Sequence, residues 1–311
     1  MGGIGCIINP NSGGRKSRQI DGLKEIIDGY GILKITNNIE ELAAVAEEFQ
    51  KEGIEYVLIK GGDGTIHRVI TAFANQYGEA ELPKFFLLCG GTMCTLAKSL
   101  GLNGDPVKNC QSFISCYLAK LKFPIINQQT VMWNEKVGFM TGAGAVSSFL
   151  ALYYDESGAG PWQATKVIAK GIGSLVARGE YVKRMFQSMC CRITIDGNEL
   201  GPHEHKALLI STIKGIGLGF KPTPLAYDKF GHFHCLVADL ELKAWEVLLN
   251  APAIYLGRVL KNPKVHNFVA SKVVIEPYEK FKYTIDGEVY LADPLCVLKV
   301  QTGPVIQFVK V

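Results

Sequence analysis

The sequence contains no long apolar run. No stretch of about 18 apolar residues without charges occurs, so we expect no transmembrane helix. The segment from Met1 to Ile8 lacks both a basic leader and an apolar run of signal length, which argues against a secretory signal. We therefore expect a cytoplasmic protein whose contact with a membrane, if any, is peripheral.

Paired cysteine motifs are also absent. The chain has nine cysteines and no CxxC pair, so the sequence indicates neither a zinc site nor a disulfide framework. Most of these cysteines fall inside apolar segments, and we expect them to be reduced residues of the core. They are Cys6, Cys89, Cys94, Cys110, Cys116, Cys190, Cys191, Cys235 and Cys296.

Neither sign of charge dominates the composition. The net charge is +4 at pH 7, and no basic stripe with interleaved aromatic residues occurs, which argues against nucleic-acid binding. The mild excess of positive charge suits an anionic ligand or an anionic membrane surface. With 311 residues, 48% of them hydrophobic, the chain can form two globular domains.

Three glycine-rich segments each follow a short apolar strand in the first hundred or so residues. Helix-like periodicity follows the strands, so the pattern predicts a doubly wound parallel α/β domain with its ligand at the carboxyl ends of the strands. The segments are Asn9-Pro10-Asn11-Ser12-Gly13-Gly14, Gly61-Gly62-Asp63-Gly64-Thr65 and Gly90-Gly91-Thr92-Met93.

The central glycine segment, residues 61–65, carries the most specific pattern. Its three glycines let a ligand approach the main chain, and the helix expected after it would offer free N–H groups to phosphate oxygens. Asp63 adds a carboxylate suited to a metal ion or a hydroxyl proton. An ordinary Gly-Asp turn between a strand and a helix remains the alternative.

The pattern changes near residue 122, where closely spaced strands predict a mostly antiparallel β-sandwich domain. We expect an α/β nucleotide-binding domain over 1–123, a β-rich lipid-substrate domain over 124–300, and a C-terminal segment, 301–311, that returns to the first domain. The expected strands are Val131–Met140, Cys191–Ile195, Lys206–Thr212, His232–Ala238, Lys272–Glu276, Phe281–Ile285 and Pro294–Val300. The expected helices are Ser147–Tyr154, Trp162–Arg178 and Leu242–Leu260.

The order of these motifs resembles that of the diacylglycerol kinase catalytic-domain superfamily, and in particular its small bacterial lipid kinases. The resemblance spans nearly the whole chain and implies the two-domain NAD kinase/diacylglycerol kinase-like fold. It rests on the opening NPxSG loop, the GGDGT signature, a GTxN-like loop and a distant DGE motif. In this sequence these are Asn9–Gly13, Gly61–Thr65, Gly91–Cys94 and Asp286–Glu288.

The resemblance implies phosphoryl transfer from ATP with Mg²⁺. Asp286 would take the proton of the lipid hydroxyl as general base, while Asp63 and Glu288 would hold the metal and Asp63 would organise the nucleotide. Without the resemblance, Asp286-Gly287 reads as a hairpin turn. The implied nucleotide-binding residues are Asn9, Asn11, Ser12, Gly13, Gly61, Gly62, Asp63, Gly64, Thr65, Gly91, Thr92, Met93 and Glu288.

The sequence departs from the family pattern at several positions, among them Cys94, Lys229 and Phe230. Cys94 replaces the usual Asn, and we expect an unreactive thiol there rather than a reactive one. Lys229 and Phe230 replace acidic residues where some relatives hold a structural metal, which puts that metal in doubt. His232 and His234 alternate along a predicted strand, and we expect them to be surface residues rather than metal ligands.

Three functions follow from these patterns. The leading one is an ATP-dependent lipid kinase acting on diacylglycerol or a sphingoid base. The alternatives are an NAD kinase-like phosphotransferase and a nucleotide- or lipid-binding protein with little or no catalysis. We expect a lipid substrate, ATP and a membrane surface as partners, and the sequence leaves a homodimer open. Core packing with a solvated basic face is the alternative to a membrane edge for the aromatic and basic residues Trp162, Trp245, Lys166, Lys170, Arg178, Lys183 and Arg184.

Overall fold

A computed structural model describes residues 3–11, 16–36, 38–88, 94–102, 104–148, 186–215 and 220–311. The chain divides into two compact units. Unit 1 comprises Met1–Gln128 and Pro304–Val311, and unit 2 comprises Gln129–Gly303. Strands β5 (Ile125–Trp133) and β16 (Leu298–Val309) each contribute residues to both units.

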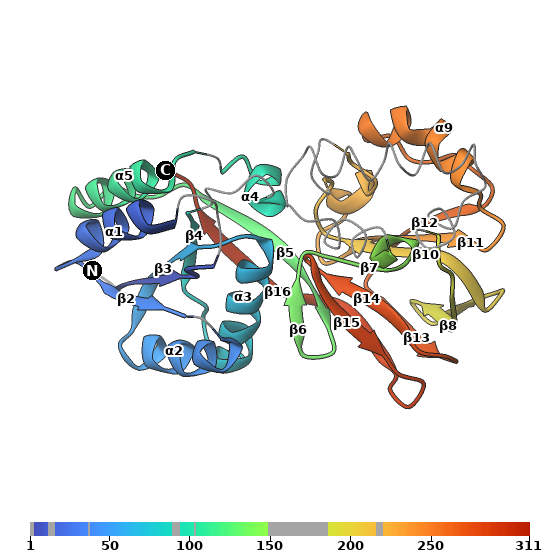
Figure 1. The fold of residues 1–311 in the computed structure, drawn as a ribbon, viewed down its shortest axis with the longest axis horizontal. Helices are drawn as coiled ribbons and strands as arrows, with labels where there is room; N and C mark the ends of the chain where they lie inside the picture. Colours follow the sequence, from blue (N-terminus) through green and yellow to red (C-terminus); the bar gives the residue numbers. More distant parts are fainter. Residues whose placement is uncertain are drawn as a thin grey trace. The chain divides into compact units, whose positions relative to one another are not determined.

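Unit 1 is built on a parallel sheet with the strand order β16-β4-β3-β1-β2. Its other strands are β1 (Gly3–Ile8), β2 (Ile32–Ile35), β3 (Ile54–Lys60) and β4 (Lys84–Leu87). The helices between them are α1 (Lys16–Ile27), α2 (Ile39–Lys51), α3 (Asp63–Tyr77), α4 (Thr95–Ser99) and α5 (Pro106–Leu118). Figure 1 shows α1 and α5 on one side of this sheet and α2 and α3 on the other. The predicted doubly wound α/β domain is confirmed.

The two faces of the unit 1 sheet bury different side chains because successive strand residues point to opposite faces. Ile4, Cys6 and Ile8 of β1 pack in one cluster with α1 and α5. On the other face, a Cβ at Gly5 would lie 2.2 Å from the ring of Phe49 in α2. Gly5 therefore permits the close approach of α2 to the sheet.

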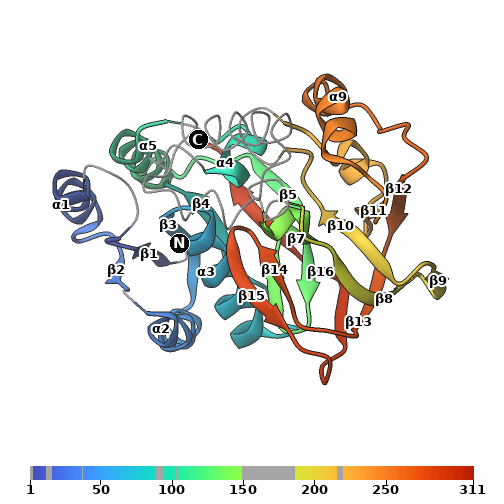
Figure 2. The same cartoon turned by 45° about the vertical axis from the view of Figure 1, so that its right-hand side comes forward.

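Unit 2 is built from antiparallel strand pairs. One run of neighbours is β15-β14-β7-β10 with β11 and β12 beyond it, and a second joins β8, β13 and β16 (Figure 2). The strands are β6 (Lys136–Gly138), β7 (Met140–Gly144), β8 (Met189–Ile195), β9 (Asn198–Leu200), β10 (Glu204–Ser211), β11 (Phe233–Asp239), β12 (Val265–Ala270), β13 (Lys272–Pro277), β14 (Phe281–Ile285) and β15 (Glu288–Ala292). The helices are the 3-10 helix η1 (Pro224–Tyr227) and α9 (Ala244–Tyr255).

The predicted antiparallel β-domain is confirmed, with three corrections at strand level. The single strand expected over Val131–Met140 is wrong, because Asn134 has a φ of 51° and the chain turns there between β5 and β6. The last strand begins at Leu298 rather than Pro294 and continues to Val309. Strands β7, β9, β12 and β15 are present but were not predicted. The helix expected over Trp162–Arg178, and most of that over Ser147–Tyr154, lies outside the described residues.

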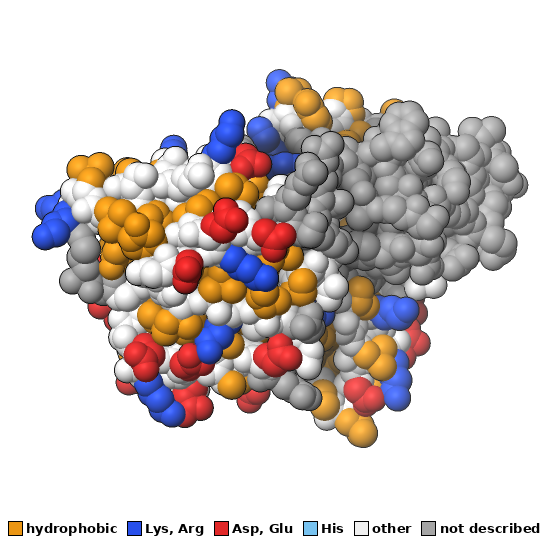
Figure 3. Space-filling model, turned by 60° about the vertical axis from the view of Figure 1, so that its left-hand side comes forward, with side chains coloured by type: hydrophobic (Ala, Val, Ile, Leu, Met, Phe, Trp, Pro, Cys, Tyr) orange, Lys and Arg blue, Asp and Glu red, His pale blue; other side chains and the backbone are white. Residues whose placement is uncertain are grey.

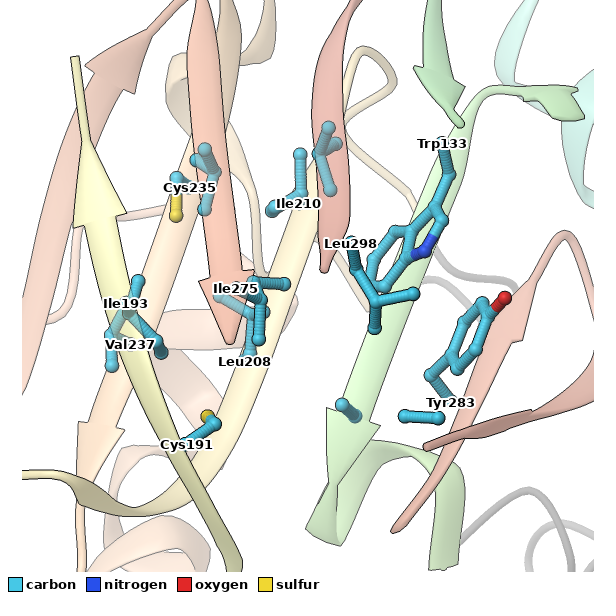
Figure 4. Close-up of a cluster of buried hydrophobic side chains, with 14 of the residues drawn as sticks. Trp133, Cys191, Ile193, Leu208, Ile210, Cys235, Val237, Ile275, Tyr283 and Leu298 are labelled. Carbon is cyan, nitrogen blue, oxygen red and sulfur yellow. The ribbon is translucent and has the colours of Figure 1, made fainter. Parts of the chain in front are cut away.

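The core of unit 2 gathers side chains from both runs of strands (Figure 4). Ile193 and Ile275 come from β8 and β13, while Leu208 and Val237 come from β10 and β11. At one end of this cluster the indole of Trp133 stacks on the ring of Tyr283, with centroids 4.5 Å apart. This contact joins β5 to β14, the strand that leads to the Asp286 turn.

The face of the molecule drawn in Figure 3 carries basic and acidic side chains interspersed with small apolar areas. Ion pairs of unit 1 include Lys34 with Glu48 at 2.7 Å and Lys84 with Glu55 at 3.0 Å. Alternating charge of this kind fits the small net charge of the chain.

Candidate functional site

The glycine turn after β3 lies at the carboxyl edge of the unit 1 sheet. Helix α3 begins at Asp63, and its N-cap is Gly62, which has no side chain to cap the first N–H groups. A Cβ at Gly61 would lie 2.3 Å from the Cβ of Thr65, so the turn needs a glycine there. The first turn of α3 thus offers N–H groups and a positive dipole end to an anion.

The side chain of Asp63 links this turn to a second helix. Its Oδ2 accepts a hydrogen bond from the N–H of Thr95 (2.8 Å), and its Oδ1 accepts one from the N–H of Leu96 (3.1 Å). Both donors lie in the first turn of α4, whose own N-cap residue, Cys94, makes no side-chain cap. Asp63 therefore caps the N-terminus of α4, although it lies far from α4 in the sequence. A carboxylate at a helix N-terminus stabilises the helix in this way.

Burial raises the pKa of the Asp63 carboxyl above its ordinary value of 3.8, against the opposing effect of the Thr95 and Leu96 N–H groups and of the Lys98 charge. The two carboxylate oxygens receive the N–H groups of Thr95 and Leu96 and a side-chain hydrogen bond from Thr95, which leaves room for one further donor. A carboxylate in this state can still accept from a metal-bound water. The residue type and its remaining acceptor position therefore fit a hydrated Mg²⁺, which prefers oxygen ligands and retains several waters.

Asn9 fastens the loop after β1 to the glycine turn. Its Nδ2 donates to Thr65 Oγ1 at 2.8 Å, and its Oδ1 accepts from the N–H of Asn11 at 2.8 Å. Its backbone N–H donates to the carbonyl of Lys60 at 3.0 Å. The structure thus brings together Asn9, Asn11 and residues 61–65, while the predicted Ser12, Gly13, Gly91, Thr92 and Met93 lie outside the described residues.

Two further residues belong to this edge of the sheet. Cys94 is buried, and its thiol lies 3.7 Å from the carbonyl oxygen of Gly61, which agrees with the unreactive thiol expected there. Lys60, which ends β3, is only 3% exposed, and the sequence analysis gave it no role. The sequence pattern that could have drawn attention to Lys60 is a lysine at the end of an apolar strand, directly before a glycine turn.

Asp286 lies in unit 2, in the hairpin turn between β14 and β15. Asp286 and Gly287 have φ values of 45° and 93°, the left-handed pair expected of an Asp-Gly hairpin turn. Its carboxylate accepts from the N–H of Phe139 at 3.0 and 3.1 Å and from the N–H of Met140 at 2.9 Å, and its own N–H donates to the Met140 carbonyl. The hairpin turn and an oriented carboxylate therefore coexist at this position.

The neighbours of Asp286 restrict its position further. A Cβ at Gly138 would lie 2.5 Å from Cγ2 of Ile285 and 2.6 Å from Oδ2 of Asp286, so only glycine leaves room for the carboxylate. Glu288 begins β15 directly opposite Ile285 and is partly buried. The Asp286 carboxylate is held by the backbone N–H groups of Phe139 and Met140. Because any residue except proline has such a group, the sequence does not mark these two residues as its partners.

The histidines are not arranged as metal ligands. His234 is fully buried, which corrects the expectation of a surface residue. Its Nδ1 accepts from the N–H of Leu225 at 3.4 Å, so Nε2 carries the proton that bonds Asn267 Oδ1 at 3.0 Å. Burial lowers the pKa of His234, consistent with a neutral ring. Among the described residues, no group of three His, Cys, Asp or Glu side chains could hold a metal ion.

The segment around Lys229 and Phe230 is where some relatives hold a structural metal. Asp228, Lys229 and Phe230 follow η1 and are exposed, and the side chain of Phe230 is 77% exposed. For the NAD kinase alternative, Asn198 and Glu199 are exposed residues of β9 rather than part of the preceding turn. Glu199 lies 3.0 Å from His203 Nε2, so it already has a partner.

Comparison with known proteins gives matches to both parts of the chain. Residues 4–122 match the family described as the diacylglycerol kinase catalytic domain, and residues 178–306 match the YegS C-terminal NAD kinase beta sandwich-like domain. A "Putative lipid kinase" of Streptococcus pneumoniae is 32% identical over 103 residues. That alignment covers 32% of this chain and 34% of the relative, so the chain matches about a third of the relative's length.

Solved structures show the same fold over nearly the whole chain. A diacylglycerol kinase from Bacillus anthracis matches with a TM-score of 0.66 at 13% identity, and a "putative diacylglycerol kinase" from the same organism matches with 0.73 at 14%. Each match covers 99% of this chain and 97% of the other. Within the described part of the chain, no helix is long and apolar enough to span a membrane. Residues 4–122 are therefore similar to a diacylglycerol kinase catalytic domain and residues 178–306 to the YegS C-terminal domain, and the fold is that of the bacterial diacylglycerol kinase-like structures.

Proposed function

We propose that this protein is an ATP-dependent lipid kinase that transfers the γ-phosphate of ATP to the hydroxyl of a lipid such as diacylglycerol or a sphingoid base. The observation that carries the proposal is the glycine turn of residues 61–65, with Asp63 fixed at the carboxyl edge of a parallel sheet, in a chain that matches both domains of the family. Phosphoryl transfer depends mostly on positioning and on charge stabilisation, which such a turn supplies.

In the proposed reaction, the lipid hydroxyl oxygen forms a bond to the γ-phosphorus. The bond from that phosphorus to the bridging oxygen of ADP breaks, and the hydroxyl proton passes to the carboxylate of Asp286. The Phe139 and Met140 N–H groups hold that carboxylate in one orientation, as a general base requires. Bound Mg²⁺ would neutralise charge on the phosphates.

The residues of unit 1 have separate roles in this proposal. Asp63 organises the nucleotide and contributes a carboxylate oxygen to the hydrated Mg²⁺. The first turn of α3 and the loop of residues 9–13 bind phosphate oxygens through N–H groups. Gly91, Thr92 and Met93 complete the nucleotide site by analogy with the family.

The test is phosphoryl transfer by the purified full chain from γ-labelled ATP with Mg²⁺, with diacylglycerol, sphingosine or NAD as acceptor in separate reactions. We expect label on one of the two lipids and none on NAD. Retained ATP binding without transfer to either lipid would overturn the kinase proposal in favour of a binding protein. Label on NAD would favour the alternative phosphotransferase, which the name of the matched β-sandwich family keeps open.

A further inference from the structure

Helix α9 of unit 2 exposes a stripe of large apolar side chains. Trp245, Leu249, Pro252 and Leu256 follow the spacing i, i+4, i+7 and i+11, which places them on one face of a helix. All four are exposed, and Trp245 and Leu249 are 52% and 71% exposed. We call these four residues the outer face of α9. Figures 1 and 2 both draw α9 at an edge of unit 2.

The opposite face of α9 is already used for packing. Ala244 is buried, and Val247 packs against a cluster that includes Leu209 and Leu236. The outer face is therefore not needed to hold the helix on unit 2. A run of exposed Trp and Leu side chains on a helix is typical of an interaction surface rather than of an ordinary solvated face.

Basic side chains surround the C-terminal end of this helix. Lys221, Arg258 and Lys261 are exposed, and within the described chain none of them forms an ion pair. Lys221 is held beside the helix end, because its N–H donates to the Ile254 carbonyl at 3.0 Å and a Cβ at Gly257 would lie 3.2 Å from its Cδ. The three cations thus lie near the end of the apolar stripe.

We propose that the outer face of α9 docks on an anionic membrane. Trp and Leu side chains enter the interface between headgroups and acyl chains, and Lys221, Arg258 and Lys261 contact lipid phosphates. The unpaired cations favour an anionic bilayer over a second copy of a chain that is itself positively charged, at +4. The inference goes beyond the proposed function because membrane binding is measured without ATP.

The test is co-sedimentation of the full chain with phosphatidylcholine vesicles, with and without phosphatidylglycerol. We expect binding that requires phosphatidylglycerol and weakens with salt. Leu249→Glu should weaken it about tenfold or more, because the apolar burial of one Leu is lost. The matched control is Leu295→Glu, at a residue that is 92% exposed in the loop before β16; this variant should bind like the wild type.

A second pair of variants tests the cations. Arg258→Gln with Lys261→Gln should weaken binding to anionic vesicles about thirtyfold, from about 1 kcal/mol for each cation. Lys108→Gln with Lys122→Gln removes the same charge from exposed positions of unit 1 and should leave binding within about threefold of wild type, since distant charges are screened. Equal losses in the two doubles would show a general charge effect and overturn the docking site.

Tryptophan emission gives an independent readout. Vesicles should shift the emission of the wild type to the blue, and Trp245→Phe should lose most of that shift. A shift that persists in Trp245→Phe, together with normal binding by Leu249→Glu, would overturn the proposal. The proposal also fails if Leu249→Glu instead converts a dimer to a monomer in sedimentation velocity while vesicle binding stays unchanged, since a second copy would then cover α9.

Discussion

Unit 2 contains two Asp-Gly hairpin turns whose backbone φ angles are nearly identical. Asp196 and Gly197 have φ values of 45° and 86°, against 45° and 93° for Asp286 and Gly287. Each aspartate carboxylate accepts hydrogen bonds from two successive backbone N–H groups of a neighbouring segment. For Asp196 these are the N–H groups of Ser271 and Lys272, with a shortest distance of 2.9 Å.

The two turns differ in their surroundings. Asp196 is exposed and is followed by exposed residues, whereas Asp286 is partly buried and precedes the partly buried Glu288. Gly138 leaves room for the Asp286 carboxylate. The comparison shows that an aspartate with two backbone donors in a hairpin turn is a stable structural motif by itself. A catalytic role for Asp286 must therefore be tested against Asp196, which also has two successive backbone donors, with the Ser271 hydroxyl in addition, and no proposed chemistry.

The largest expected effect comes from the two aspartates themselves. Asp286→Asn removes the proposed base, and we expect transfer to lipid to fall by about a hundredfold to ten-thousandfold, with ATP binding retained. Asp196→Asn disturbs an equivalent set of hydrogen bonds and should leave the transfer rate unchanged. Steady-state transfer from γ-labelled ATP and equilibrium nucleotide binding measure the two quantities. Equal losses in both variants would mean that Asp286 acts through the fold alone.

Gly138→Ala tests the space around the Asp286 carboxylate. The added Cβ would collide with Ile285 and with Asp286 Oδ2, so we expect a loss of about 1–3 kcal/mol in the free energy of unfolding, as for overpacking, and slower transfer. Gly201→Ala is the matched control, because a Cβ there meets nothing within 4 Å. Urea unfolding and transfer rates are the measurements, and an unchanged Gly138→Ala would contradict the described packing.

Substitution of either turn glycine by alanine should lower the free energy of unfolding by a similar amount. The two variants should differ in their rate of phosphoryl transfer. Gly287→Ala and Gly197→Ala each place a Cβ at a positive φ, which costs about 1–2 kcal/mol in unfolding free energy. Only Gly287→Ala should also slow transfer, because it displaces the Asp286 carboxylate. Thermal unfolding of both variants and their transfer rates would check this. A slower rate in both would remove the distinction between the turns.

The smallest effect concerns Asp63, the buried carboxylate of unit 1, and depends on pH. Its raised pKa means that the folded state binds a proton more tightly than the unfolded state does, so its contribution to stability is greatest at low pH and is lost as pH rises from about 4 through the raised pKa. Asp63→Asn removes this titration. We therefore expect the stability of the wild type relative to Asp63→Asn to fall with rising pH, as measured by urea unfolding across that range. A difference that rises with pH would contradict the raised pKa.

Much of the fold was predictable because it depends on side-chain periodicity. The strand at Ile32–Ile35 and the helices α1 to α3 follow the apolar spacing of the sequence. Helix α5 was not predicted, although Asp105 caps the N–H groups of Val107 and Lys108 and Pro106 stands in the first turn. Strand β15 was hidden because Val289 and Leu291 are exposed, which gives no alternation of buried apolar and exposed polar residues.

The candidate site was predictable at its carboxylates and glycines but not at their donors. Asp63, Asp286 and Gly61 have side-chain chemistry or backbone freedom that the sequence displays. The groups that fix the two carboxylates are the N–H groups of Thr95, Leu96, Phe139 and Met140. Any residue except proline supplies such a group, so residue identity does not mark these positions. Which N–H faces which carboxylate depends on the tertiary fold.

Strand β16 has a consequence for the way the gene can be divided. Phe308, in its last residues, pairs in parallel with Phe85 of β4, so unit 1 is encoded by two separate stretches with all of unit 2 inserted between them. A fragment that stops at residue 128 would leave the edge of β4 uncovered, with Phe85 and Phe86 beside it. An open, apolar strand edge is a template for aggregation. A soluble form of unit 1 alone should therefore need residues 304–311 joined back to residue 128 through a short linker in place of unit 2.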